Sequence, residues 1–145
     1  MPQPLVVVLD TSVWISGVFF QRGIPAAILR AWAARRFEIV ATPETLAELE
    51  RKLREKVTQF RAEPDLAKEW IAFVNAFAQI IPATTTISGV CRDSNDDMFL
   101  SAALSGEARY IVSSDHDLQV LDEHQGVKVL SLREFAELLG IVSPA

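Results

Sequence analysis

Three aspartates stand at positions where a cluster of carboxylates could carry out chemistry. Asp10 directly follows the apolar run at residues 5–9, and Asp115 follows a second apolar run at 110–112 after two serines. Asp96 lies near the start of the stretch DSNDDMFLSAAL. Carboxylates within about 4–6 Å repel one another, so some take up protons unless a cation neutralises them. A hard divalent ion with oxygen ligands does this, and such sites suit Mg²⁺ or Mn²⁺.

The reaction available to such a cluster is hydrolysis of a phosphodiester bond. A divalent ion lowers the pKa of a bound water molecule, and with the substrate phosphate it stabilises the charge of in-line displacement. No histidine or serine nucleophile is then needed, and the spacing of His116 and His124 fits no metal-ligand pair. The single cysteine, Cys91, excludes an internal disulfide and a multi-cysteine zinc site, and we interpret it as a small core residue.

The elements that must position these acids follow from apolar periodicity and helix-capping signals. Strands are predicted at residues 5–9, 37–41, 80–81, 110–112 and 127–130. Helices are predicted at 24–35, 42 to about 57, 64–78, 95–105, 118–124 and in a closing segment that ends at 139. Alternating strands and helices predict a three-layer α/β/α domain, with a parallel sheet of four to five strands covered on both faces. The length of 145 residues, 50% of them hydrophobic, suits a single domain over 1–145.

This topology is expected to bring the three aspartates to one place. Ligands of open parallel sheets bind beyond the carboxyl ends of the strands, where Asp10 and Asp115 both lie. Asp96 precedes Phe99 and Leu100 by three and four residues, so it shares the apolar stripe of its helix and points toward the sheet. Asp97 is rotated away from that stripe and is expected to face water.

Some of the acids could instead stabilise local structure. Asp10 could close an Asx-turn. Helix capping is the favoured interpretation for three others, Asp93, Asp97 and Asp117. Asp10 and Asp96 are harder to explain in this way, because a carboxylate at a core edge needs a partner and the nearby sequence offers only Arg92 as a cation.

Charge and hydropathy limit the partners of the chain. A net charge of −5 argues against a wholly basic nucleic-acid binder. The basic run RKLREK at 51–56 could contact phosphates, but interleaved glutamates make an ordinary charged helix face at least as plausible, so no RNA-contacting residue is assigned. No apolar run approaches the ~20 residues of a membrane span and no signal peptide is recognised, so we expect a cytoplasmic protein without membrane contact.

Four segments of the chain resemble the motifs of PIN-domain nucleases. VVVLDTSVWISG resembles their first strand, which ends in Asp-Thr-(Asn/Ser), and TPETLAELERKL resembles their second acidic motif. DSNDDMFLSAAL and YIVSSDHDL resemble the third and fourth. The four motifs occur in family order over nearly the whole chain, and the closest likeness is to the VapC-like group, described as toxin components of toxin–antitoxin systems.

The resemblance implies the fold, the reaction and the site residues. It implies a sheet ordered 3-2-1-4-5 and cleavage of single-stranded RNA with Mg²⁺ or Mn²⁺. The metal-binding catalytic acids would be Asp10, Glu48, Asp96 and Asp115. Supporting roles would fall to Thr11 and Ser12 beside the first acid, to Ser113 beside the last, and to the extra acids Asp93 and Asp117. Ser12 stands where asparagine is more usual and keeps an oxygen ligand there.

Glu48 is assigned by this resemblance against its place on the helical wheel. Leu46, Leu49, Leu53 and Val57 define the buried stripe of its helix, and Glu48 lies well off that stripe. Glu44 is the competing residue, although an acid in the first turn also complements the helix dipole without any catalytic role.

The sequence therefore predicts a metal-dependent endoribonuclease, the toxin of a toxin–antitoxin pair, with a cognate antitoxin protein and a homodimeric state. The alternative is a catalytically silent PIN-like module that binds RNA or protein. A phosphatase with an aspartyl nucleophile would require a second aspartate two positions after the first, where Ser12 stands.

Overall fold

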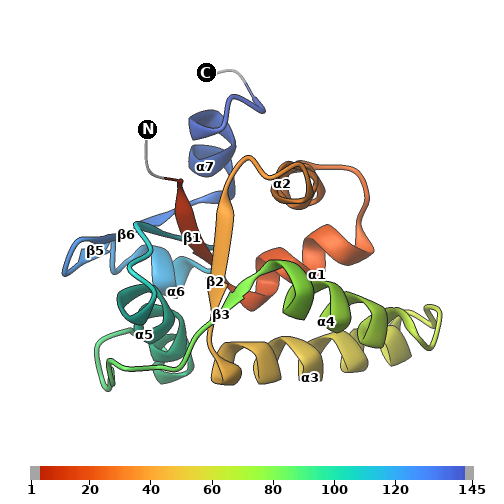
Figure 1. Ribbon diagram of the computed structural model, residues 1–145, viewed down its shortest axis with the longest axis horizontal. Coiled ribbons are helices and arrows are strands. Elements are labelled where there is room, and N and C mark those ends of the chain that lie inside the picture. The colour runs from red at the N-terminus through yellow and green to blue at the C-terminus, as the bar shows by residue number, and fades with distance from the viewer. Residues whose placement is uncertain (1–3, 143–145) are drawn as a thin grey trace.

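A six-stranded sheet forms the centre of the computed structural model, which describes residues 4–142 (Figure 1). The strand order is β3-β2-β1-β4-β6-β5. The strands are β1 (Val6–Leu9), β2 (Glu38–Ala41), β3 (Gln79–Ile80), β4 (Tyr110–Val112), β5 (Glu123–His124) and β6 (Val127–Leu130). All neighbours pair in parallel except β5 and β6. The parallel strands β3-β2-β1-β4-β6 follow the predicted order 3-2-1-4-5 when β6 is counted as the fifth, and the sixth strand, β5, was not predicted.

The antiparallel edge strand β5 is a correction to the sequence prediction. The helix predicted at 118–124 is the short α6 (His116–Gln119), and the chain then turns through Asp122, which has a left-handed φ of 58°. A second turn with φ of 49° at Gln125 and 85° at Gly126 returns it as β6. Glu123 and His124 therefore pair with β6 and do not continue the helix.

Helices cover both faces of the sheet and confirm the three-layer α/β/α architecture. They are α1 (Thr11–Phe19), α2 (Ile24–Ala33), α3 (Pro43–Gln59), α4 (Leu66–Phe77), the 3-10 helix η1 (Ser94–Asp96), α5 (Asp97–Ser105), α6 and α7 (Leu132–Leu138). Alternate residues of β1 point to opposite faces, so Val7 and Leu9 enter one core cluster and Val8 the other. The first cluster includes side chains of α1, α2, α3, α4 and α7, and the second includes side chains of α5 and α6. Figure 1 shows these two groups of helices on opposite sides of the sheet.

Helix α1 was not expected from the sequence. Its residues are apolar nearly all round, so no amphipathic stripe marks a helix. The helix nevertheless begins directly after β1, because the Asp10 side chain accepts a hydrogen bond from the Val13 backbone amide and caps it. It then packs on α2, where the rings of Trp14 and Trp32 meet edge to face at 5.3 Å.

Helix α3 begins where the sequence predicted. Thr42 caps it, its hydroxyl accepting from the Thr45 amide, and the Thr45 hydroxyl in turn accepts from the Thr42 amide. Pro43 occupies the first turn, where no backbone donor is needed. Leu49 and Leu53 are buried, which confirms the predicted apolar stripe.

No single helix within residues 4–142 is long and apolar enough to cross a bilayer. Among the described residues, the one helix pair with the length and composition of a membrane span is α1 with α2, and a 94° bend separates the two helices.

Gly106 marks a close contact between the end of α5 and the sheet, and its substitution tests that packing. A methyl group at Gly106 would lie 2.5 and 2.9 Å from the two methyls of Val40 and 3.1 Å from Ile81 Cδ1. Because Val40 is buried and β-branched in a strand, it has little room to move. We expect Gly106→Ala to lower the free energy of unfolding by about 1–3 kcal/mol, measured in urea.

Val40→Ala supplies the control for this prediction. The single variant should also be destabilised, because it leaves a cavity. In the double variant the new methyl occupies part of that cavity, so its loss of stability should be smaller than the sum of the two single losses. Strictly additive losses would mean that crowding against Val40 is not the cause.

Candidate functional site

Asp10 is buried at the carboxyl edge of the sheet, where hydrogen bonds hold both its backbone and its side chain. It follows β1, its backbone amide donates to the Val112 carbonyl at 3.1 Å, and its side chain is 4% exposed. Oδ1 accepts from the Ser12 hydroxyl at 2.6 Å and from the Val13 amide at 3.1 Å. Oδ2 accepts from the Ser113 hydroxyl. Both carboxylate oxygens are therefore held by neutral donors.

Ser113 joins Asp10 to the acid that follows β4. Its hydroxyl, besides donating to Asp10, accepts from the Asp115 amide at 2.9 Å. Asp115 is half-buried and caps α6, since its Oδ1 accepts from the Asp117 amide at 2.9 Å. The sequence placed Ser113 beside the last acid only, whereas the structure places it between the first and the last.

Asp96 completes a group of three aspartates from three segments of the chain. It ends η1, which Asp93 caps by accepting from the Asn95 amide at 3.0 Å. Asp96 is 8% exposed, as expected for a side chain that points toward the sheet. Its Oδ2 is buried and has no hydrogen-bond partner in the described part of the chain.

Electrostatics show that these aspartates interact. Burial, together with the neighbouring carboxylates of Asp115, Asp93 and Asp10, raises the pKa of Asp96 to about 7, and burial contributes most to this shift. Burial also raises the pKa of Asp10, although the hydrogen bonds from Ser113, Ser12 and Val13 oppose the shift. The structure thus brings Asp10, Asp96 and Asp115 together, with Asp93 beside them.

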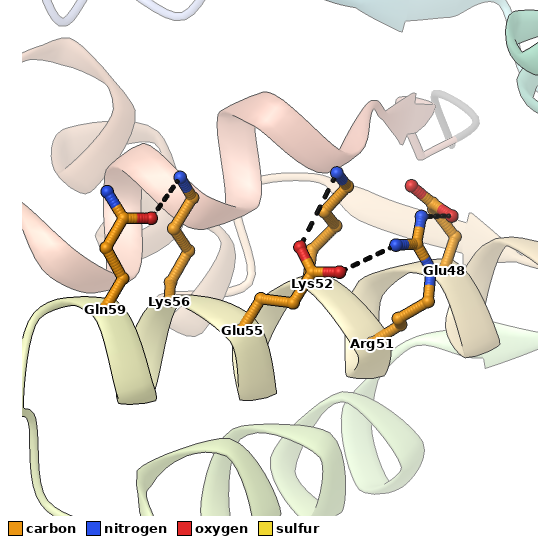
Figure 2. Close-up of polar contacts among 6 residues, drawn as sticks. All are labelled: Glu48, Arg51, Lys52, Glu55, Lys56 and Gln59. Carbon is orange, nitrogen blue, oxygen red and sulfur yellow. Dashed lines mark hydrogen bonds and ion pairs between the residues drawn. The ribbon is translucent and has the colours of Figure 1, made fainter.

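Glu48, the acid of the second motif, has a different environment from the three aspartates. On α3 its carboxylate accepts from the Arg51 guanidinium at 2.9 Å, and Arg51 also pairs with Glu55 at 2.8 Å (Figure 2). The competitor Glu44 is exposed in the first turn of the same helix. The charges that raise the pKa of Asp96 come from aspartates and do not include Glu48. The described contact of Glu48 is with Arg51 on its own helix.

The basic run on α3 forms ion pairs within the helix. Lys52 lies 3.7 Å from Glu55, and Arg54 lies 3.6 Å from Glu50. Figure 2 shows the same face continuing to Lys56, which donates to Gln59. The charged-face interpretation of this run is therefore confirmed in the structure.

Asp97 is a correction, because it does not face water. It is 6% exposed, and its carboxylate accepts from the Cys91 amide at 2.8 Å and the Gly89 amide at 2.9 Å. Burial alone would raise its pKa, but these hydrogen bonds outweigh burial and lower it. Cys91 is buried, and burial raises the pKa of its thiol to about 12, as suits a core residue.

Two further side chains at this edge, Ser114 and Arg92, have no site role in the sequence prediction. Ser114 shares a hydrogen bond of 2.8 Å with the Ser12 hydroxyl. Arg92 lies 3.6 Å from Asp117, the second extra acid of the resemblance. The proximity of Arg92 to the third motif was the only signal for it in the sequence. Thr11, expected beside Asp10, is the half-buried first residue of α1.

The donor set fits a hard divalent ion that keeps part of its water shell. Within residues 4–142, no three His, Cys, Asp or Glu side chains are arranged as a ready-made metal site. Mg²⁺ commonly uses only one or two carboxylates, with water and substrate phosphate as the other ligands. The unpartnered Asp96 Oδ2 among like charges is the kind of oxygen that such an ion would satisfy.

Comparisons with solved structures show where this fold occurs. One similar structure is VapBC2 from Rickettsia felis, bound to a DNA fragment from the VapBC2 promoter. The match covers 88% of this chain and 98% of the matched chain, with 13% identity and a TM-score of 0.59. PAE2754 from Pyrobaculum aerophilum matches 95% and 91%, with 14% identity and a TM-score of 0.63. VapBC-1 from nontypeable Haemophilus influenzae matches 89% and 99%, with 13% identity and a TM-score of 0.55.

Sequence comparison gives the family. The uncharacterized protein MJ1680 of Methanocaldococcus jannaschii is 30% identical over 125 residues, which are 85% of this chain and 79% of MJ1680. The family model of the PIN domain matches residues 6–117, a span that contains Asp10, Glu48, Asp96 and Asp115. This chain belongs to the PIN domain family.

Proposed function

We propose that this protein is a metal-dependent endoribonuclease that hydrolyses phosphodiester bonds of single-stranded RNA. PIN domains are generally nucleases, and those nucleases generally use divalent metals. The observation that carries the proposal is the buried Asp96 Oδ2, which has no hydrogen-bond partner within residues 4–142 and lies near Asp10 and Asp115. A carboxylate in that position is costly to the metal-free fold, and a cation removes the cost.

The proposed roles follow from the contacts of each acid. Asp10 is held rigidly by Ser12 and Ser113, and Asp115 by the Asp117 amide, so both would present oxygens in fixed positions. Asp96 offers the free oxygen. When bound, Mg²⁺ or Mn²⁺ would supply water activation and stabilisation of phosphate charge. Glu48 would join after leaving Arg51, and Asp93 and Asp117 would support the other acids.

The biological role proposed is that of a toxin in a toxin–antitoxin pair. Support comes from the similar folds of VapBC2 and VapBC-1, which carry the names of toxin–antitoxin assemblies. The corresponding partners would be an antitoxin protein and a second copy of the chain. Because its substrate would be cellular RNA, the site of action would be the cytoplasm.

Two observations favour a catalytically silent module that binds RNA or protein. Among residues 4–142 no ready-made three-ligand set is present, and Glu48 is paired with Arg51. The two functions differ in a single property, which is metal-dependent cleavage.

Cleavage of single-stranded RNA is the decisive measurement. With Mg²⁺ or Mn²⁺ we expect products on a denaturing gel, and EDTA should abolish them. Asp10→Ala, Asp96→Asn and Asp115→Asn should each lower the rate by at least about 100-fold, because each removes charge that would hold the ion. Asp65→Asn, at an exposed acid that precedes α4, should retain full activity. Activity that survives EDTA, or survives all three site substitutions, rules out the proposed chemistry.

Asp96 also makes the stability of the metal-free protein depend on pH. Its folded pKa of about 7 lies above the ordinary 3.8, so the folded state binds the proton more tightly than the unfolded state. Stability in EDTA should therefore fall as pH rises from about 4 to 7, by about 1–3 kcal/mol from this group. Asp96→Asn should lack that part of the fall in urea unfolding, whereas Asp65→Asn should keep it.

Addition of Mg²⁺ at pH 8 should restore stability to the unmodified protein and much less to Asp96→Asn. If stability depended on pH in the same way in both proteins in EDTA, Asp96 would not be the group whose raised pKa causes the fall.

Adjacent serines test whether support of Asp10 matters. Ser113→Ala removes the hydroxyl that joins Asp10 to Asp115, and we expect RNA cleavage to fall about 10–100-fold, as for other groups that orient metal ligands. Ser114→Ala removes an exposed hydroxyl that contacts only the Ser12 hydroxyl in the described structure, and should change the rate a few-fold at most. Similar losses in both variants would contradict a special role for Ser113.

A further inference from the structure

Arg92 lies at the rim of the three-aspartate cluster, on the loop that precedes Asp93. Its guanidinium is 3.6 Å from Asp117 Oδ1, and its side chain is 63% exposed. Asp117 in turn donates its backbone amide to Asp115 Oδ1. Arg92 therefore connects the segment that carries Asp96 to the segment that carries Asp115, and it does so on the solvent side.

The backbone that carries Arg92 is held on both sides. On one side, the buried Asp97 carboxylate binds the amides of Gly89 and Cys91. On the other, Asp93 caps η1 through the Asn95 amide. Arg92 is thus an exposed cation on an anchored loop, which is a favourable position for contact with a ligand.

From this arrangement we infer that Arg92 binds a phosphate of the RNA strand next to the bond that is cut. The inference rests on the proposed function and adds a substrate-binding residue to it. RNA phosphates that approach this edge meet the negative charges of Asp10, Asp93, Asp96, Asp115 and Asp117, so a cation at the rim offsets their repulsion. The planar fork of an arginine suits phosphate oxygens, to which it can donate two hydrogen bonds.

The ion pair with Asp117 is suited to exchange. At 3.6 Å it is longer than a charge-assisted hydrogen bond, and both partners are exposed, so it contributes little to stability. Replacement of Asp117 by an RNA phosphate would therefore cost the fold little. If Arg92 had a purely structural role, its effect on RNA binding would depend on the ion pair with Asp117.

A matched control exists on helix α3. Arg54 lies 3.6 Å from Glu50, and the side chains are 62% and 44% exposed, against 63% and 45% for Arg92 and Asp117. The two arginines thus have the same pairing distance and exposure, and differ in their place relative to the aspartates. Arg54→Ala removes the same charge from the protein as Arg92→Ala.

The test measures binding of a fluorescein-labelled, single-stranded 2′-O-methyl RNA in Mg²⁺ by anisotropy, with its integrity checked on a gel. Arg92→Ala should weaken binding about 5–10-fold and reduce the slope of log K against log salt by about 0.7, the value for one lost phosphate contact on a single strand. Arg92→Lys should keep most of the slope. Arg54→Ala should change affinity less than twofold.

Three results would overturn the inference. Equal losses for Arg92→Ala and Arg54→Ala would mean that only overall charge matters. The same loss and slope change in Asp117→Asn as in Arg92→Ala would mean that the ion pair, and not a phosphate contact, is responsible. An unchanged salt slope in Arg92→Ala would exclude a phosphate contact directly.

The outcome separates this inference from the proposed function. If the unmodified protein cleaves RNA and Arg92→Ala leaves both KM and binding unchanged, the inference fails and the nuclease proposal stands. If the protein binds RNA through Arg92 but cleaves none, the nuclease proposal fails and the phosphate contact stands. A urea midpoint for Arg92→Ala equal to that of the unmodified protein confirms that folding is intact.

Discussion

The parallel pairing of β1 with β4 is the constraint on which the acidic edge depends. Leu9 lies opposite Val112, so the residues that follow the two strands, Asp10 and Ser113, leave the sheet side by side. A slip of one residue would turn the Ser113 side chain to the other face and separate it from Asp10. The two-strand register therefore does more than build the core. It also fixes which hydroxyl meets the buried carboxylate and where Asp115 begins its helix.

Burial of Asp10 is tolerated because neutral donors, and not a cation, surround it. Two hydroxyls and one amide satisfy its oxygens, which offsets the cost of desolvation without cancelling the charge. These donors oppose the rise that burial causes in the Asp10 pKa, and the carboxylates of Asp115, Asp93 and Asp10 act together on Asp96, whose Oδ2 has no such donor among the described residues. Because the partners of Asp10 are hydroxyls and an amide, the described hydrogen bonds bring no cation to the three aspartates.

Much of this arrangement was predictable from local patterns, and the exceptions have physical reasons. The order of the parallel strands, the capped start of α3 at Thr42 and the inward direction of Asp96 follow from periodicity and capping. Helix α1 was missed because a uniformly apolar segment has no period, and β5 because two residues carry too little pattern. The sequence predicts that Asp97 faces water, because a helical wheel shows the polar stripe of α5 but not the loop that covers it. Ser101 and Ser105 on the same stripe bind the backbone at Thr85, so that stripe holds the loop.

The edge thus combines fixed and exchangeable polar groups, and the difference lies in burial. Asp10, Asp97 and Ser113 are buried and bound to backbone or hydroxyl donors, so loss of a partner would leave an unsatisfied group. In the ion pairs Glu48–Arg51 and Arg92–Asp117 the arginine side chains are exposed, and surface pairs contribute only about 0–1 kcal/mol. An ion or a phosphate at this edge could displace either cation at small cost, whereas it could not rearrange the buried set. Any adaptation of the site to ligands must therefore come from its exposed charges, while the buried aspartate and its hydroxyls keep their geometry.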